Sequence, residues 1–576
     1  MMSSLISGKN RHQLRITLSA VVLIALSLMI RLHDLDRESL YMDELKQVSY
    51  YTHSFIDIIR LAATQQQPPL DYWIGHFVAG ISTSDFAVRL PSVFFGTGMI
   101  VFYFLLISRY CAWRVAFGFA AIMSLLPYQL YYSQEARPYA IALFFLMALF
   151  WSLDRFFTRP GINFSTCLLT FLFCAGFLFS RTLSPFLVVL TTLFLISAGY
   201  VYLKTTDKSE KSAAFRRRLI PVAIIFATCL AMYLPFFLNI LFRSDRYTIG
   251  KAATINLLNI FVGVKNFSLI PLRKALVVQT EPLTMIIGLL VLLSCFAIRK
   301  YKPAPVFTLI LILLPCVAIA HVFIFTAKTN WPFRPAYAIY LLPFTFILAA
   351  IAFEAVQQWL SRRDLPACVK IAPTAILILM VMVTVNATLN FKQTSRKNDW
   401  RGLAAYLSAA YDENNIILFD SLSAYGEWEP TFMGFPRYYE GSSRLLPLSQ
   451  IPSAAPKMVQ SSLEPVLVLY QWREISLTHE SRYPVFPLPE TNKTVDYKSI
   501  SGNPSIKTKN FLGFLVIEPK RPAPNLAAGA LEICEKLLAM LPNDDSVIDI
   551  ELSRCALQDA LIAQKRNNDE SPQSVQ

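Results

Sequence analysis

Charged side chains are scarce in this sequence. Asp, Glu, Lys and Arg make up 16% of its 576 residues, whereas a soluble domain has about 25%. Hydrophobic residues make up 55% of the chain, and the mean hydropathy is +0.45. A soluble chain of this length would need more polar surface, so the composition excludes an ordinary soluble protein and predicts a membrane protein.

The sequence also lacks a CxxC pair, although it contains nine cysteines. This absence argues against a zinc or redox site. Seven of the cysteines lie in or beside apolar segments, where a thiol behaves as a small hydrophobe. The other two, Cys534 and Cys555, lie in a polar C-terminal region. On the oxidising side of a membrane they either form a disulfide or stay unpaired, and the sequence leaves both alternatives open.

No nucleic-acid recognition motif accompanies the net charge of +15. Membrane proteins gather Lys and Arg in their cytoplasmic loops, and this habit accounts for the charge. We therefore expect no nucleic-acid partner.

Eleven segments are long and apolar enough to cross a membrane, because a spanning helix needs about 20 residues. Lipid satisfies no backbone hydrogen bonds, so all of them are expected to be helices. They lie at about 15–32, 89–108, 114–131, 138–154, 163–180, 182–203, 219–242, 282–298, 304–326, 336–358 and 369–390.

The connections between these segments support the count and give an orientation. With the N-terminus in the cytoplasm, every even-numbered connection is short and basic, as the positive-inside rule requires. Arg109 with Arg114, and Arg299 with Lys300, are examples. No small-residue cleavage site follows the first segment, so we expect it to remain as an anchor.

The C-terminal part differs from the rest because strand-length apolar runs alternate there with helical stretches. The runs NIILFD, EPVLVLYQW and KNFLGFLVIEP occupy 415–420, 464–472 and 509–519. Such alternation is typical of a small α/β domain. The predicted fold is thus an α-helical polytopic membrane protein with a soluble α/β domain. Its parts are a transmembrane domain at 1–390 with a long outer loop at 33–88, an outer α/β domain at 391–566 and a disordered tail at 567–576.

The long outer loop holds two motifs. Asp43 and Glu44, in YMDELKQ, closely follow a transmembrane segment, and partly desolvated carboxylates are better proton acceptors. An ordinary solvated acidic pair is the alternative. QQQPPLDYWIGHF at 65–77 contains two prolines that stiffen the chain beside Gln67 and Tyr72. It is either part of a substrate cavity or a structural turn with an interfacial anchor.

Two further motifs place arginines at the outer membrane boundary. Arg89, in FAVRLPS, either snorkels or holds an anionic headgroup. LYYSQEARPYAI at 130–141 contains Glu135 and Arg137 beside Tyr139. Ionisable residues at this level are costly, so they are usually functional or paired. The alternatives are a local Glu–Arg pair or an arginine that faces a phosphate, whose oxygens suit its planar donors.

Later in the chain, KTNWPFRPAYAIYLLPF at 328–344 places Lys328 and Arg334 at the outer end of the tenth span. His321 lies near the outer end of the ninth. A lone histidine there is more often a hydrogen-bonded helix residue than a catalyst.

The order of these motifs resembles the GT-C superfamily of membrane glycosyltransferases. It is most similar to the bacterial branch related to protein O-mannosyltransferases and lipid A aminoarabinose transferases. Residues 30–145 resemble it well and 325–410 loosely, and KNDWRGLAAYL at 397–407 looks like the start of the outer domain. At Gln67 the chain departs from the aminoarabinose transferases, which have a lysine before the loop proline. The resemblance therefore does not carry over one phosphate contact of that branch, and it argues less strongly for the transfer of aminoarabinose to lipid A.

The resemblance implies an inverting transfer of a sugar from a polyprenyl phosphate to a hydroxyl at the outer face of the bacterial cytoplasmic membrane. Asp43 matches the catalytic carboxylate, and Glu44 the second acidic position, which helps to place the acceptor. The leaving phosphate needs positive charge near it. Arg137 is the first choice, followed by Arg334, Lys328 and Arg89, and the predicted cavity includes Gln67, Tyr72, Glu135, Tyr139, His321 and Tyr337.

No cluster of metal ligands is evident, so we expect neither a metal nor a cofactor. The acceptor is a cell-envelope lipid such as lipid A, another glycan or a protein. Two other functions remain alternatives: a transporter or flippase for a lipid-linked glycan, and a non-catalytic scaffold that binds polyprenyl lipids. Neither of these needs a carboxylate at Asp43.

Overall fold

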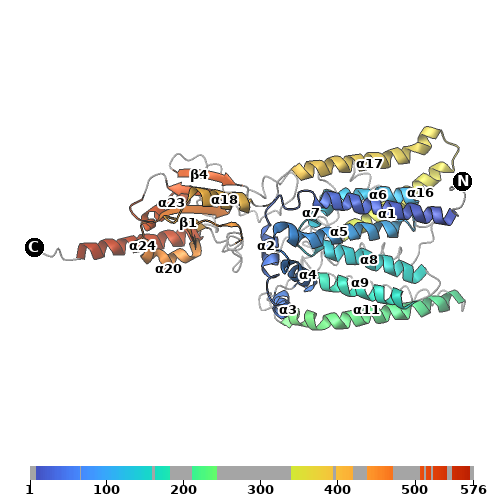
Figure 1. The fold of residues 1–576 in the computed structure, drawn as a ribbon, viewed down its shortest axis with the longest axis horizontal. Coiled ribbons are helices and arrows are strands. Elements are labelled where there is room, and N and C mark those ends of the chain that lie inside the picture. The colour runs from blue at the N-terminus through green and yellow to red at the C-terminus, as the bar shows by residue number, and fades with distance from the viewer. Residues whose placement is uncertain are drawn as a thin grey trace, which may run out of the picture. The chain divides into compact units, whose positions relative to one another are not determined.

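A computed structural model gives the fold of the chain (Figure 1). It describes residues 8–64, 67–158, 163–181, 210–242, 339–393, 397, 399–419, 437–470, 506–511, 514–519, 523–540 and 548–570. The chain forms two compact units. The first combines residues 1–35 with 50–394, and the second combines 36–49 with 395–576. The short segment 36–49 therefore groups with the C-terminal residues, a division that the sequence did not suggest.

The first unit is a bundle of long apolar helices. Five of the described helices are long and apolar enough to cross a membrane, and three shorter ones are also apolar. The chain is thus a multi-pass helical membrane protein, as predicted. The helices are α1 (Gly8–Leu32), α3 (Phe55–Thr64), α4 (Leu70–Ala79), α5 (Asp85–Ile107), α6 (Trp113–Leu125), α7 (Pro127–Tyr132), α8 (Tyr139–Thr158), α9 (Phe164–Ser180), α11 (Glu210–Phe242), α16 (Leu341–Ser361) and α17 (Ala367–Gln393).

Most predicted spans overlap these helices, with one correction. The segments 182–203, 282–298 and 304–326 lie outside the described residues, so the count of eleven stays a prediction. The span predicted at 114–131 is broken between α6 and α7. Leu126 has φ −56° and ψ 123°, outside the helical region, because Pro127 disfavours a helical conformation in the residue before it.

The helices of the first unit pack side by side. α5 contacts both α1 and α8, α8 contacts α9, and α9 contacts α11 (Figure 1). Glycine allows one of these close approaches, because a Cβ at Gly98 would lie 2.7 Å from the ring of Phe144. On α17 apolar side chains such as Ile371 and Met382 are exposed. Exposed apolar side chains on a long apolar helix are suited to contact with lipid.

A buried arginine fastens the turn after α7 to α1. The Arg31 side chain is fully buried. Its Nε donates to Ser133 Oγ at 2.9 Å and its Nη1 to Ser27 Oγ at 2.6 Å. In return, Gln134 Nε2 donates to the Arg31 carbonyl oxygen at 2.7 Å, and Lys392 of α17 donates to Gln134 Oε1 at 3.1 Å. These bonds fix the backbone that leads into Glu135 and Arg137.

The second unit is built on a five-stranded mixed sheet, so the predicted α/β character of the C-terminal region is confirmed. The strand order is β2-β1-β3-β5-β4. β1 is parallel to β2 and β3, whereas β5 is antiparallel to β3 and β4. The elements are α2 (Met42–Ser49), α18 (Trp400–Ala410), β1 (Asn415–Phe419), β2 (Arg444–Pro447), η4 (Leu448–Gln450), α20 (Ile451–Met458), β3 (Glu464–Tyr470), β4 (Ile506–Phe511), β5 (Phe514–Pro519), α23 (Leu526–Met540) and α24 (Ile548–Glu570).

The run at 509–519, predicted as one strand, is corrected to parts of two. β4 and β5 pair with each other, with Phe511 opposite Phe514. Residues 512 and 513 between them, the second a glycine, lie outside the described residues.

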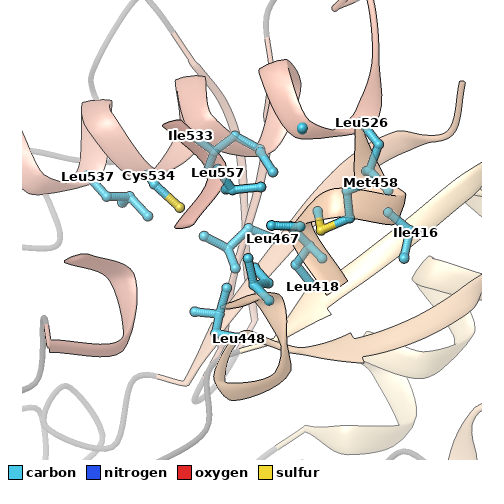
Figure 2. Close-up of a cluster of buried hydrophobic side chains, with 14 of the residues drawn as sticks. Ile416, Leu418, Leu448, Met458, Leu467, Leu526, Ile533, Cys534, Leu537 and Leu557 are labelled. Atoms are coloured by element: carbon cyan, nitrogen blue, oxygen red, sulfur yellow. The ribbon is translucent and has the colours of Figure 1, made fainter. Parts of the chain in front are cut away.

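One hydrophobic cluster joins the sheet of the second unit to its helices. Figure 2 shows Leu418 and Leu467 of the sheet meeting Met458 of α20, Ile533 of α23 and Leu557 of α24. All five side chains are almost completely buried. Burial of apolar surface on this scale is what lets the unit fold around its own core.

The two C-terminal cysteines have opposite environments. Cys534 is buried in the hydrophobic cluster and Cys555 is exposed, and both are free thiols. The structure thus corresponds to the unpaired alternative. Burial raises the pKa of the Cys534 thiol from 9.0 to about 12. Because the thiolate is the nucleophile, Cys534 should be inert at neutral pH.

We therefore expect a maleimide to label Cys555 and not Cys534 in the native full-length protein, prepared without reductant. Peptide mapping by mass spectrometry measures both sites. Labelling in denaturant is the control, in which both thiols should react. A Cys534–Cys555 disulfide, or prompt native labelling of Cys534, would contradict the described core.

Candidate active site

The acidic pair predicted to be catalytic lies on α2 in the second unit, and its two members differ. Glu44 is completely buried. Its Oε2 accepts a hydrogen bond from the Tyr41 backbone N–H at 2.9 Å, which is the glutamate half of a capping box. The same oxygen accepts from Lys397 Nζ at 2.6 Å. Asp43 is only partly buried. Glu44 thus has a capping contact and a buried ion pair, whereas Asp43 is the more accessible carboxylate of the two.

In the first unit, Tyr51, which follows α2 in the sequence, pairs with the carboxylate of Asp71 on α4. Tyr51 Oη donates to Asp71 Oδ2 at 3.3 Å, and both side chains are buried. Burial, followed by the nearby charge of Asp71, holds the pKa of Tyr51 well above its ordinary value of 10.0, while Arg137 acts in the opposite direction. His76 Nδ1 also lies 2.8 Å from the Tyr51 carbonyl oxygen. Tyr51 therefore remains a hydrogen-bond donor, and Arg137 lies within its electrostatic reach.

The loop motif with two prolines packs against this pair. Tyr72 of α4 is buried and its Oη donates to Gln67 Oε1 at 3.3 Å. The Tyr72 ring lies 5.7 Å from that of Tyr50 and 6.5 Å from that of Tyr51, between ring centroids. The structure thus brings together Gln67 and Tyr72, which the sequence predicted to share a cavity, and adds Tyr50, Tyr51 and Asp71.

The turn between α7 and α8 presents Glu135 and Arg137. The Arg137 backbone N–H donates to the Glu135 carbonyl oxygen at 2.8 Å, and Ser92 Oγ of α5 donates to the Arg137 carbonyl oxygen at 3.4 Å. Glu135 is buried, and Arg137 is half-buried. The Arg137 guanidinium lies 6.0 Å from the ring centroid of Tyr139.

A second arginine, which the sequence motifs did not indicate, packs its guanidinium over the ring of Tyr139. Arg181 follows the last residue of α9, and its guanidinium is 4.1 Å from the Tyr139 ring centroid and 5.5 Å from that of Tyr340. It is only 8% exposed. Such distances are typical of cation–π contacts. The available signal was a lone arginine in a predicted outer connection, where the positive-inside rule does not favour basic residues.

The other predicted residues are Arg89 and four residues outside the described part of the chain. Arg89 is buried and its Nη1 donates to the Leu35 carbonyl oxygen at 2.8 Å, which gives it a structural contact; its predicted role at the donor phosphate stays a prediction. Four other residues lie outside the described part of the chain, and their roles also stay predictions: His321, Lys328, Arg334 and Tyr337. Within the described part, no three His, Cys, Asp or Glu side chains are grouped as a metal site.

No protein-family model and no curated protein match the sequence. The structure is similar, at TM-scores below 0.5, to solved structures of ArnT and of an oligosaccharyltransferase. ArnT from Cupriavidus metallidurans, in the apo state, gives a TM-score of 0.48 at 13% identity, over 86% of this chain and 97% of that chain. The same protein bound to undecaprenyl phosphate gives 0.46 at 12% identity, with the same coverage. The Archaeoglobus fulgidus oligosaccharyltransferase gives 0.47 at 12% identity, over 81% and 70%.

Gly75 makes room for Tyr51. A Cβ at Gly75 would lie 2.3 Å from Tyr51 Cε1. Gly75→Ala is therefore expected to push the ring away from Asp71 and to destabilise the protein by about 1–3 kcal/mol. The thermal unfolding midpoint of the full chain in detergent measures the effect.

Gly80→Ala is a matched control, because the nearest atom to its added Cβ is 3.5 Å away. In a Tyr51→Ala background, Gly75→Ala should cost little, since the clashing ring is gone. An equal loss of stability in both backgrounds would show that the Tyr51 contact is not the cause.

Proposed function

We propose that the chain is an inverting glycosyltransferase that moves a sugar from a polyprenyl-phosphate donor to a hydroxyl of a cell-envelope lipid, glycan or protein. The reaction takes place at the outer face of the bacterial cytoplasmic membrane. The observation that carries this proposal is the pair of guanidinium groups, from Arg137 and Arg181, that share the ring of Tyr139 at one end of the helical bundle.

The two arginines suit a phosphate carried by a lipid. Each guanidinium has a planar fork of donors that matches phosphate oxygens, and it stays charged even when largely buried. Charge-assisted bonds of this kind are among the stronger hydrogen bonds in proteins. Their position beside long apolar helices leaves the polyprenyl chain of the donor in lipid. The phosphate is the leaving group, so the same charges that bind the donor also stabilise the charge that develops as the reaction proceeds.

The reaction needs one base. The Asp43 carboxylate takes the proton from the acceptor hydroxyl, whose oxygen attacks the anomeric carbon of the sugar. The bond between that carbon and the phosphate oxygen breaks, and polyprenyl phosphate leaves with both electrons. A phosphate leaves without protonation, so the second carboxylate that glycoside hydrolases use as an acid is not needed.

The different surroundings of the acidic pair favour Asp43 as this base. One carboxylate oxygen of Glu44 already accepts bonds from Lys397 and from the backbone of Tyr41. Asp43 is the more accessible of the two, and a base has to come within hydrogen-bond reach of the acceptor hydroxyl.

Arg181→Ala and Arg137→Ala are each expected to weaken the binding of undecaprenyl phosphate about 10- to 100-fold. Each removes charge-assisted hydrogen bonds worth about 1.5–3 kcal/mol. Titration of the purified full chain with undecaprenyl phosphate, followed by native mass spectrometry, measures the change.

Arg155→Ala is the matched control. Arg155 also lies on an aromatic ring, 4.4 Å from the centroid of Trp151, but near the opposite end of α8 from Tyr139. Equal affinity for undecaprenyl phosphate in wild type, Arg181→Ala and Arg137→Ala would contradict the donor site.

Asp43→Asn is expected to keep undecaprenyl phosphate binding and to lower transfer by about 10²-fold or more, because the base is lost. Mass spectrometry of envelope lipids and glycans measures transfer, in cells that lack the gene and carry the wild type or the variant. Asp412→Asn, at an exposed turn of the second unit, is the control. Full transfer by Asp43→Asn would contradict the proposed base.

A further inference from the structure

The helix with the proposed base belongs to the C-terminal unit, although it lies near the start of the sequence. Glu44 and its partner Lys397 are separated by 353 positions, and both fall in the second unit. Lys397 is also the first residue of KNDWRGLAAYL, the motif that marks the start of the outer domain in the sequence. The proposed reaction gives this motif no role.

Several hydrogen bonds tie the segment before α2 to the same unit. The Leu40 backbone N–H donates to Tyr438 Oη at 2.9 Å. Ser39 Oγ accepts from the Arg401 backbone N–H at 3.1 Å, and Arg401 Nη2 donates to the Asp36 carbonyl oxygen. Because α18 starts at Trp400, the two bonds of Arg401 fix the approach to α2 against the first turn of α18.

The ion pair between Glu44 and Lys397 holds α2 itself. The Glu44 side chain is 0% exposed and that of Lys397 is 5% exposed. Removing one partner of a buried ion pair is strongly destabilising, so the contact between α2 and Lys397 is strongly favoured. Leu45 and Val48 are buried too. Successive helix residues do not point in the same direction, so anchoring Glu44 leaves Asp43 on another side of the helix.

From this arrangement we infer that Lys397 is a positioning residue for the glycosyl transfer, which acts through Glu44 to hold Asp43 in place. The inference rests on the proposed function and changes the role expected of Glu44. Glu44 does not place the acceptor; it anchors the helix of the base. The C-terminal domain therefore takes part in the reaction, because it fixes where the base stands.

Lys397→Met tests the inference, because it keeps most of the side-chain volume and removes the charge. The expected result is a loss of kcat of about 10²-fold, as small misplacements of a catalytic group cost that much. Undecaprenyl phosphate binding should stay at the wild-type level, since Arg137 and Arg181 belong to the other unit. Hydrogen exchange of the α2 amides should become faster in the variant.

Matched variants separate positioning from simple destabilisation. Lys457→Met, an exposed lysine of α20 in the same unit, should leave both kcat and the protection of α2 unchanged. Lys397→Arg keeps the charge and should retain more activity than Lys397→Met. In Glu44→Gln with Lys397→Met both buried charges are gone, so the thermal midpoint should recover relative to Lys397→Met alone.

The outcomes distinguish this inference from the proposed function. If Asp43→Asn keeps full transfer, the proposed base is wrong, while faster exchange of α2 in Lys397→Met still shows that Lys397 anchors the helix. If Lys397→Met keeps wild-type kcat and wild-type protection of α2 while Asp43→Asn is inactive, the proposed function stands and the positioning role is overturned. If the loss of kcat across the variants only parallels the fall in their thermal unfolding midpoints, the positioning role of Lys397 is also overturned.

Discussion

The proposed donor site depends on two guanidinium groups, those of Arg137 and Arg181, that lie near the buried ring of Tyr139. Positive charges repel each other, and the repulsion grows where water is scarce. Arg137 and Arg181 nevertheless both lie within cation–π distance of Tyr139. The aromatic ring stabilises the two guanidinium groups in part. The buried carboxylate of Asp71 lies in the same unit and accepts a hydrogen bond from Tyr51, whose pKa the charge of Arg137 lowers.

Specific contacts hold the backbone and side chains around these two arginines in place. The turn that presents Arg137 is held through Ser133 and Gln134 by the buried Arg31 of α1. On the loop side, Gly75 allows Tyr51 to lie close to α4. The cations are therefore placed by packing and hydrogen bonds that do not depend on a ligand, which is the kind of preorganisation that electrostatic catalysis requires.

The proposed chemistry draws on both units. The cations belong to the helical bundle, whereas Asp43 belongs with the C-terminal unit, tied to it through Glu44 and Lys397. In the proposed reaction, donor binding is assigned to residues of the first unit and the base to a residue of the second. Variants of the two units should then have different kinetic signatures, with donor affinity changing in one case and turnover in the other.

Much of this architecture was predictable from the sequence, and the failures have physical causes. Hydropathy located the membrane helices because lipid imposes long apolar runs, and alternating segments indicated the α/β domain. Arg137 was predicted as a candidate because a charge inside a Tyr-rich boundary motif is conspicuous, and its role stays a prediction. Arg181 was missed because its contact with Tyr139 joins helices from different parts of the sequence. Glu44 and Asp43 were not distinguished, because the partner of Glu44 lies 353 positions away.

The central claim is that Arg137 and Arg181 together bind a lipid-borne phosphate. An experimental structure of the full chain with undecaprenyl phosphate tests it most directly. Phosphate oxygens are expected about 2.7–2.9 Å from guanidinium nitrogens of both arginines. A phosphate bound elsewhere, with the two side chains still gathered on Tyr139, would contradict it.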